Sequence, residues 1–368
     1  MPLLMNAVQQ KRHKTGDIAA VLLAHYDVHA RDLPWRKLPG TGLPDPYHVW
    51  LSEIMLQQTT VAAVIPYFAK FTATWRDFAA LAAADDADVM AAWAGLGYYA
   101  RARNLVKCAR MVAATYNGNL PTTEAELLKL PGIGPYTAAA IAAIAFGQRS
   151  VVVDANVERV VARLFAILAP LPQAKPLIGE ATDMITPAFR AGDFAQAMMD
   201  LGAGICSVKN PSCMICPINA HCAAFAAGNA DAYPVKPPKK TKPYRTGTAY
   251  WIERQGHVWL VTRAGRGMLA GMRGLPDDRW AARVHGDSIA PAKARWNELD
   301  ARVTHVFTHF TLELKIAVTA WPNDTDGPGE GEWWPVNSLD KAGLPTLFDK
   351  VAAAVCSHER VDLTATQL

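Results

Sequence analysis

The chain lacks any apolar run long enough to cross a membrane, which takes about eighteen to twenty residues. It also lacks the pattern of a secretory signal. The basic residues 11–14 are followed by only a short apolar stretch, Ile18 to Leu23, before His25. We therefore expect a protein of the cytosol that makes no membrane contact.

A strong excess of either charge is missing as well. The 37 Lys and Arg residues outnumber the 33 Asp and Glu residues only slightly, so the formal net charge is +4. This balance permits nucleic-acid binding without identifying it. The chain is 51% hydrophobic and 19% charged, which excludes a largely disordered protein. Its 368 residues suffice for two domains with separate cores.

Cysteine is scarce, and its distribution is uneven. Four of the six cysteines fall between Cys206 and Cys222, with six, two and five residues between them. In a reducing compartment such clustering favours a metal centre over disulfides. Four thiolates suit either tetrahedral zinc or a [4Fe–4S] cluster, and ligand count does not separate the two. Cys108 and Cys356 lie in helix-like patterns, where we expect them to pack.

The most informative stretch runs from Leu130 to Val160. Residues 130–134 read Leu-Pro-Gly-Ile-Gly, a tight turn whose backbone N–H groups, with the following helix start, suit a bound phosphate. The helix predicted from Tyr136 to Phe146 is mostly alanine and isoleucine, so it should be buried and end at Gly147. Asp154 then precedes a predicted helix over 156–168. It is either the N-cap or a carboxylate aimed at the gripped ligand, and the two roles are compatible.

Upstream, the pattern predicts one helix from Tyr47 to Phe71, kinked at Pro66. Glu53 and Gln57 lie one turn apart and so share a face. A glutamate in such a helix is ordinarily solvated or capped, and a catalytic role is the alternative.

The glycine-containing segment 95–104 predicts a turn. One interpretation is a loop with buried tyrosines and solvated arginines. The other is a wedge, in which Leu96 or Tyr98 enters a base stack while Arg101 and Arg103 contact phosphates.

Beyond the helical region, residues 233–246 are rich in proline and lysine and predict an extended linker. The apolar period then changes to two: residues 310–318 alternate as in a half-buried strand. Residues 250–252 and 258–261 predict a hairpin, and residues 344–355 predict a helix. A second domain of α+β type follows from these elements.

These motifs together resemble a known family. A glycine hairpin followed twenty residues later by Asp154 is similar to the helix-hairpin-helix DNA glycosylase superfamily, and residues 47–59 resemble its adenine-specific branch. The cysteine spacing resembles the cluster loop of endonuclease III, which implies a [4Fe–4S] cluster. The second domain resembles the Nudix-like module of MutY-type adenine DNA glycosylases. The acidic Nudix metal box is missing, so we expect a DNA reader rather than a pyrophosphatase.

The resemblance implies two folded domains. The first is an all-α glycosylase domain over 16–232, after a flexible tail at 1–15, with the hairpin near 130–136 and the cluster loop at 206–222. A linker over 233–247 leads to an α+β Nudix-like lesion-recognition domain over 248–368. We expect a monomer.

The implied activity is excision of adenine paired with 8-oxoguanine or guanine in double-stranded DNA, after base flipping. Glu53 would protonate adenine and then activate water, and Asp154 would stabilise the oxocarbenium-like sugar. For this task Glu53 needs a pocket dry enough to raise its pKa.

The resemblance also implies roles for further residues. The positions that would orient Asp154 and the sugar are Tyr136 and Asn156. The positions that would line the base pocket are Arg31, Trp35, Arg36, Leu56 and Gln196. The positions that would contact DNA are Gln57, Gln58, Thr59, Leu96, Tyr98, Gly132, Gly134, Phe307, Thr308 and His309. Thr308 stands where the family has serine, and a segment that often carries tryptophan reads Gly-Met-Arg-Gly at 271–274. The lesion-reading loop therefore departs from the family pattern.

Two other functions are compatible with part of the sequence. A bifunctional endonuclease III-like glycosylase/lyase for oxidised pyrimidines carries a lysine nucleophile where this chain has Tyr136. A non-catalytic DNA-binding protein would have no need to keep both Glu53 and Asp154. Both are therefore disfavoured.

Overall fold

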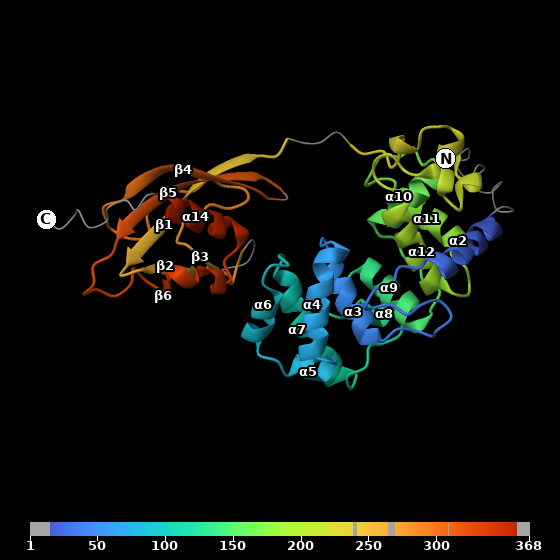
Figure 1. Cartoon of the computed structure of the whole chain (residues 1–368), viewed down its shortest axis with the longest axis horizontal. Helices are drawn as coiled ribbons and strands as arrows, with labels where there is room; N and C mark the ends of the chain where they lie inside the picture. The colour runs from blue at the N-terminus through green and yellow to red at the C-terminus, as the bar shows by residue number, and fades with distance from the viewer. Residues whose placement is uncertain (1–14, 238–240, 264–268, 308, 359–368) are drawn as a thin grey trace. The chain divides into compact units, whose positions relative to one another are not determined.

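The computed structural model describes residues 15–237, 241–263, 269–307 and 309–358 (Figure 1). The chain divides into two compact units, Met1–Pro238 and Lys239–Leu368, and the division falls inside the predicted linker. Residues 1–14 of the predicted tail lie outside the described residues, and Thr15 already begins a helix.

The first unit is helical. Its α-helices, in chain order, are α2 (Thr15–His29), α3 (Pro46–Leu56), α4 (Val61–Thr74), α5 (Phe78–Ala82), α6 (Asp86–Trp93), α7 (Ala100–Thr115), α8 (Glu124–Leu127), α9 (Pro135–Phe146), α10 (Ala155–Leu164), α11 (Lys175–Ile185), α12 (Ala191–Gly204) and α13 (Ala223–Ala226). Its 3-10 turns are η2 (Cys213–Ile215), η3 (Asn219–His221) and η4 (Ala230–Ala232).

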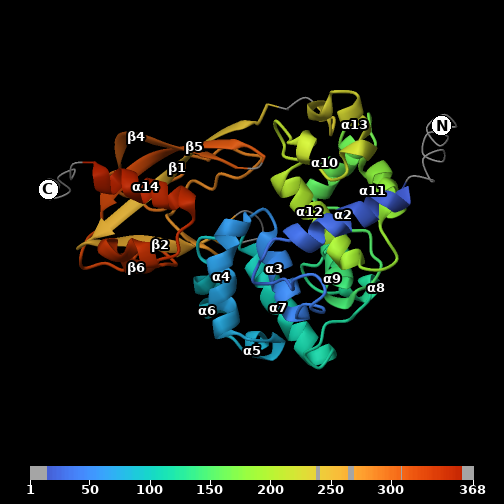
Figure 2. The ribbon, with the colours of Figure 1, turned by 45° about the vertical axis from the view of Figure 1, so that its right-hand side comes forward.

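Helix α9 lies at the centre of this unit. Residues 137–145 are all buried, as the alanine-rich sequence predicted, and Gly147 ends the helix in the left-handed conformation at φ 66°. It packs against α3 on one side and α12 on the other. Helix α2 packs against α11 and α12, as Figure 2 shows, so the start of the chain meets residues near 200. This packing brings the predicted site residues of α3, α9, α10 and α12 into one region.

The predicted helix from Tyr47 to Phe71 is wrong in one respect, because it is two helices. Helix α3 ends at Leu56, and Gln58 takes a positive φ of 60°. Thr60 then caps α4 through a hydrogen bond from the Ala63 N–H group. Pro66 lies inside α4 rather than at the break. The helix predicted over 156–168 is also shorter than expected, since α10 ends at Leu164.

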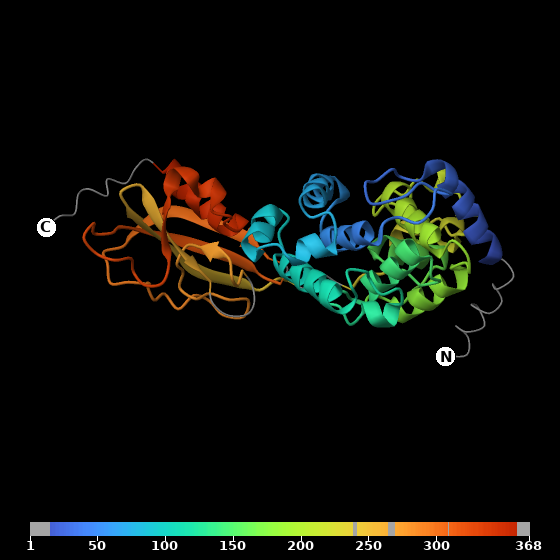
Figure 3. The ribbon, with the colours of Figure 1, turned by 90° about the horizontal axis from the view of Figure 1, so that it is seen from below.

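The second unit contains a mixed sheet. Its strands are β1 (Tyr244–Arg254), β2 (His257–Thr262), β3 (Arg273–Gly274), β4 (Asn297–Val306), β5 (Thr311–Ala320) and β6 (Glu332–Pro335). The order is β3-β2-β1-β5-β4, with β6 paired to β2. Helix α14 (Thr346–Ser357) lies along one face (Figure 3). The α+β expectation is confirmed.

Strand β5 has the predicted alternation in its first half, where Leu312 and Leu314 are buried and Lys315 is exposed. From Ile316 to Thr319 every residue is buried, so side chains on both faces of the strand are covered. Strand β1 runs parallel to β5 from Tyr244 onward. The predicted linker therefore extends too far, since residues 244–247 belong to the sheet.

Among the described residues, the structure has no helix that is both long and apolar enough to span a bilayer.

Candidate active site

Glu53 lies on α3 with only 7% of its surface exposed. Burial raises the pKa of its carboxyl to about 7, and the charge of Asp154 acts in the same direction. A hydrogen bond from Tyr136 and the charge of Arg36 oppose the shift. The acid role implied for Glu53 requires shielding from water, and the structure buries this side chain. Glu53 can therefore carry a proton near neutral pH.

Asp154 is held at the start of α10. Its Oδ1 accepts the N–H group of Val157 at 2.7 Å, which is the capping bond expected at this position. Its Oδ2 accepts Asn156 Nδ2 at 2.9 Å. Both predicted roles of Asp154 are thus sterically compatible, because the cap fixes the carboxylate without burying its charge.

Tyr136, at the start of α9, connects the two acids. It is half-buried and hydrogen-bonded to Glu53, and its pKa is raised well above the ordinary value. The causes are burial first and then the charges of Glu53 and Asp154, so all three side chains lie within electrostatic reach of one another. The hydroxyl remains protonated and serves as a donor.

Asn156 is in turn oriented by Arg159. The Arg159 Nη2 atom donates to Asn156 Oδ1 at 2.9 Å and to the Gly202 carbonyl at 2.7 Å. A Cβ atom at Gly202 would lie 2.5 Å from that of Asn156. The missing side chain at Gly202 therefore lets α12 approach the start of α10. Sequence reasoning did not find this pair, since the two residues are far apart in the chain.

The predicted base-pocket arginines converge on a residue that sequence reasoning missed. Asp200 of α12 accepts Arg31 Nε at 2.6 Å and Arg36 Nη1 at 2.9 and 3.0 Å. Its side chain is 12% exposed. Asp200 lies one turn after Gln196 on a mostly apolar helix, and this spacing was the available signal.

The other residues predicted to line the base pocket are buried or partly buried. Trp35 is buried, with its ring edge-on to Phe68 at 5.2 Å between centroids. Gln196 is buried on α12, and Leu56 is partly buried at the end of α3. These side chains supply apolar walls and one amide.

The predicted DNA-contacting residues 57–59 form the turn between α3 and α4. Gln58 is exposed, and its positive φ turns it out of the helix line. Gln57 Nε2 approaches Thr137 Oγ1 at 3.5 Å, and Thr59 accepts a bond from Arg101 at 3.0 Å. Gln58 is thus the member of this turn that is free to reach a ligand.

Of the two predicted wedge residues in segment 95–104, only Tyr98 is exposed. Tyr98 is 54% exposed, whereas Leu96 is 6% exposed and belongs to the core. Arg101 is buried and donates to the Ile54, Met55 and Leu96 carbonyl groups, so its predicted phosphate contact is wrong. Its hydrogen bonds connect the end of α3 and the turn at Thr59 with the loop at Leu96.

The glycine hairpin has the geometry that the sequence predicted. Gly132 has a positive φ of 79°, and Gly134 caps α9 without a side-chain bond. Both glycines are exposed, with Pro135 at the first helical position. The uncapped N–H groups of α9 are available to an anion.

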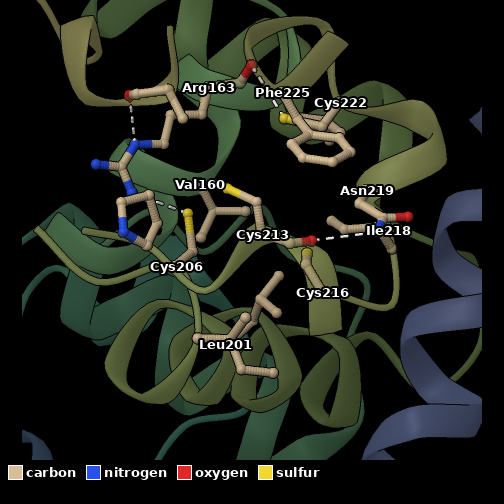
Figure 4. A pocket seen from close by; sticks show the side chains of 14 residues that line it. Val160, Arg163, Leu201, Cys206, Cys213, Cys216, Ile218, Asn219, Cys222 and Phe225 are labelled. Carbon is tan, nitrogen blue, oxygen red and sulfur yellow. Dashed lines mark hydrogen bonds between the residues drawn. The ribbon is translucent and has the colours of Figure 1, made fainter. Parts of the chain in front are cut away.

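The four clustered cysteines line one cavity of the first unit (Figure 4). Its remaining walls are mainly apolar and include Val160, Leu201 and Phe225. Buried Arg163 donates to Cys206 Sγ at 3.2 Å. Among the described residues no three His, Cys, Asp or Glu side chains are arranged to hold a single metal ion. The four thiols and the adjacent cation are the donor set and counter-charge that an anionic thiolate-ligated centre needs.

In the second unit, the predicted lesion-reading residues lie in the loop between β4 and β5. Phe307 stacks on Phe310 at 4.7 Å between centroids, and His309 is exposed. Thr308 lies outside the described residues. The Phe307 ring is thus anchored in the domain core while the loop reaches the surface.

Comparisons with known proteins agree with this architecture. Residues 51–177 match the model of the HhH-GPD superfamily base excision DNA repair protein, and residues 247–354 match that of the NUDIX domain. The adenine DNA glycosylase of Mus musculus is 41% identical, over 97% of this chain and 82% of that protein. The one of Homo sapiens is 33% identical, over 95% and 77%. A thermostable thymine-DNA glycosylase structure is 29% identical with a TM-score of 0.52, covering 60% of this chain and 99% of that one.

Proposed function

The chain belongs to the adenine DNA glycosylases of the helix-hairpin-helix superfamily, and on this premise we propose that it excises adenine mispaired with 8-oxoguanine or guanine. Glu53 is the proton donor, and Asp154 is the counter-charge to the sugar. The observation that carries the proposal is the burial of Glu53, whose pKa is raised to about 7 beside Tyr136 and Asp154.

Cleavage of an N-glycosidic bond needs an acid, because adenine leaves poorly as an anion. Protonated Glu53 supplies that proton to the base. Once ionised, the same carboxylate accepts a proton from the attacking water. The pKa near 7 suits both steps, since neither form of the carboxyl is strongly disfavoured at working pH.

The sugar becomes positively charged as the base departs, and Asp154 provides the matching negative charge. The Val157 N–H group and Asn156 fix the two carboxylate oxygens before reaction. This fixed geometry lowers the reorganisation needed in the transition state. Tyr136 donates a hydrogen bond from its hydroxyl group to Glu53 and so orients that carboxyl group.

Double-stranded DNA is the partner, and the adenine must leave the duplex to reach Glu53. The pocket for the flipped base is formed by Trp35, Leu56 and Gln196 together with the two arginines held by Asp200. The glycine hairpin grips the backbone through the start of α9. Exposed Gln58 and Tyr98 fill the gap left by the flipped base.

Cys206, Cys213, Cys216 and Cys222, which line one cavity, would hold a [4Fe–4S] cluster. When bound, it supplies iron–thiolate cross-links between the end of α12 and the loop that follows. Arg163 neutralises part of the thiolate charge through its bond to Cys206. The visible absorption spectrum tests this assignment. We expect a broad charge-transfer absorbance that is lost when iron is removed, and a colourless protein that contains zinc would contradict the assignment.

The second unit reads the base opposite adenine. Removing adenine from a correct pair would be mutagenic, so discrimination between partners is required. The loop between β4 and β5 is the candidate reader, because Phe307 is anchored by Phe310 and His309 is exposed.

The proposal is tested by single-turnover adenine release from duplexes that differ only in the opposing base. We expect the fastest release opposite 8-oxoguanine, slower release opposite guanine and little opposite thymine. Equal rates on all three duplexes would refute the mispair specificity.

The rival lyase activity is tested with borohydride, which traps a Schiff base between a lysine and the sugar. We expect little trapped adduct because position 136 is tyrosine. Trapping as fast as base release would support the bifunctional enzyme instead.

A further inference from the structure

Asp200 binds two cations of the base pocket at once. Its carboxylate accepts the Arg31 backbone N–H group at 3.1 Å and Arg31 Nε at 2.6 Å. Arg36 Nη1 donates to both of its oxygens, at 3.0 and 2.9 Å. The Arg36 and Asp200 side chains are only 7% and 12% exposed. The pairing is therefore shielded from solvent and held by several charge-assisted hydrogen bonds.

Arg36 also lies within electrostatic reach of the acid. Its charge lowers the pKa of Glu53 and that of Tyr136. The groups that face Glu53 are Tyr136 from α9, Asp154 from the start of α10 and Arg36 from the segment before α3. Arg36 is the one cation in this set. If its guanidinium turned from Asp200 to Glu53, the resulting ion pair would hold Glu53 in the ionised form.

We propose that Asp200 is a positioning residue that keeps the Arg36 guanidinium bound to α12, so that Glu53 is left free to carry the catalytic proton. This inference rests on the proposed role of Glu53 as the acid. It assigns to Asp200 a function in catalysis that neither its sequence position nor its contacts with the arginines alone would indicate.

The residues around the Asp200, Arg31 and Arg36 side chains support this role. Tyr26 of α2 lies beside them, because the charges of Arg36, Asp200, Asp193 and Arg31 all act on that hydroxyl. The Tyr26 hydroxyl is buried and has no hydrogen-bond partner among the described residues. Asp193 is already bound by Arg190 at 2.8 Å. With Asp200 removed, Glu53 is a carboxylate on which the charge of Arg36 already acts.

The test is the pH profile of single-turnover adenine release by the full chain carrying Asp200→Asn. Glu53 must be protonated, so the rate falls as pH rises through its pKa. In the variant that fall should move to lower pH by about two to three units, the scale of an opposite charge brought to roughly 4 Å with an effective dielectric constant of about 20. At lower pH the variant should recover toward the wild-type rate. Asp193→Asn, on the same helix, is the matched control and should keep the wild-type profile.

The double variant Arg36→Gln with Asp200→Asn sharpens the test. It removes both the Arg36 cation and the Asp200 carboxylate. The fall in rate at high pH should therefore return to the wild-type position, even if the maximal rate is lower. If Asp200→Asn does not fold, Asp200→Ser takes its place, because it also frees the Arg36 guanidinium and the same fall at lower pH is expected.

Two failures are distinguishable. If Asp200→Asn lowers the rate by the same factor at every pH, the residue is structural only and the inference is overturned. If Glu53→Gln still releases adenine, the proposed acid itself is wrong, whatever Asp200 does. An inactive Glu53→Gln together with an unmoved profile in Asp200→Asn refutes this inference alone.

Discussion

Asp154 illustrates how one residue performs a structural and a chemical task. Its carboxylate caps α10 through Val157, and in the proposed mechanism its charge faces the reacting sugar. Asparagine caps helices about as well as aspartate, so Asp154→Asn separates the two tasks. We expect the variant to fold and bind DNA while single-turnover excision falls by roughly 10²-fold or more.

The matched control for this prediction is Asp85→Asn. Asp85 caps α6 in the same manner, by accepting the Ala87 N–H group, but takes no part in the site. Excision by this control should be unchanged. A comparable loss in both variants would mean that capping, and not charge, explains the effect.

The raised pKa of Glu53 also has a consequence for stability. Its folded pKa of about 7 exceeds the ordinary 4.5, so the folded state binds the proton more tightly. Stability therefore falls as pH rises from about 4.5 through about 7, by up to roughly 3 kcal/mol for this group. Glu53→Gln should melt close to the wild type at pH 4.5 and clearly above it at pH 8. Melting curves at both pH values check this, and an equal difference at both would contradict it.

Single residues differ in how far the sequence could predict them. Glu53 and Asp154 were accessible because each belongs to a recognisable local motif. Asp200 could not be predicted, because its role is to bind Arg31 and Arg36, which lie more than 160 positions earlier in the chain. Arg101 was assigned to phosphates because sequence alone does not show that neighbouring carbonyl groups would bury it.

At the level of elements, the hairpin before α9 depends on one glycine more than on the other. Gly132 has a positive φ of 79°, and a Cβ there would lie 2.9 Å from the Asn104 Cβ. Gly134 has an ordinary φ of −96° and open space around it. We expect Gly132→Ala to destabilise the hairpin by roughly 1–2 kcal/mol and to weaken DNA binding, because the left-handed conformation is costly for residues with a Cβ.

Gly134→Ala is the control and should change DNA binding little. Duplex binding is best measured by fluorescence anisotropy in the Glu53→Gln background, where the substrate stays intact. If both alanine variants bind equally well, the positive φ at Gly132 does not control the grip.

The break between α3 and α4 shows why helix boundaries were harder to predict than helices. Apolar residues recur on both sides of 57–60, so periodicity alone predicted one helix. Thr60 carried the opposing signal, since threonine is a good N-cap. Pro66 attracted the predicted kink instead, yet it lies within the helix that Thr60 begins.

At the level of the whole molecule, the division into two units was predictable from composition, whereas the start of the second was not. The change from helical to alternating periodicity marks the domain change. Strand β1 nevertheless begins at Tyr244, inside the proline- and lysine-rich segment, because it pairs with β5 some 65 positions later. Such a pairing is absent from local sequence patterns.

The structure also refines where the second unit can be removed. Tyr233 is buried, its carbonyl accepts a bond from Arg163, and the Val235 carbonyl accepts one from Leu171. Truncation after Pro237 keeps these contacts. We expect the truncated protein to release adenine while losing part of its preference for 8-oxoguanine over guanine.

Single-turnover rates on the two duplexes, compared with those of the full chain, measure that preference. A control with Phe307→Leu in the full chain tests the loop between β4 and β5 without removing the unit. Full discrimination by the truncated protein would assign partner reading to the helical unit instead.

The central claim is that Glu53 protonates the departing adenine, and the most direct test is free-adenine release by Glu53→Gln in single turnover. The amide keeps the size of the side chain but cannot donate the required proton, so we predict a loss of roughly 10²- to 10⁴-fold with DNA binding retained. Glu126→Gln, an exposed change on α8, should retain the wild-type rate. Release by Glu53→Gln at near the wild-type rate would contradict the account.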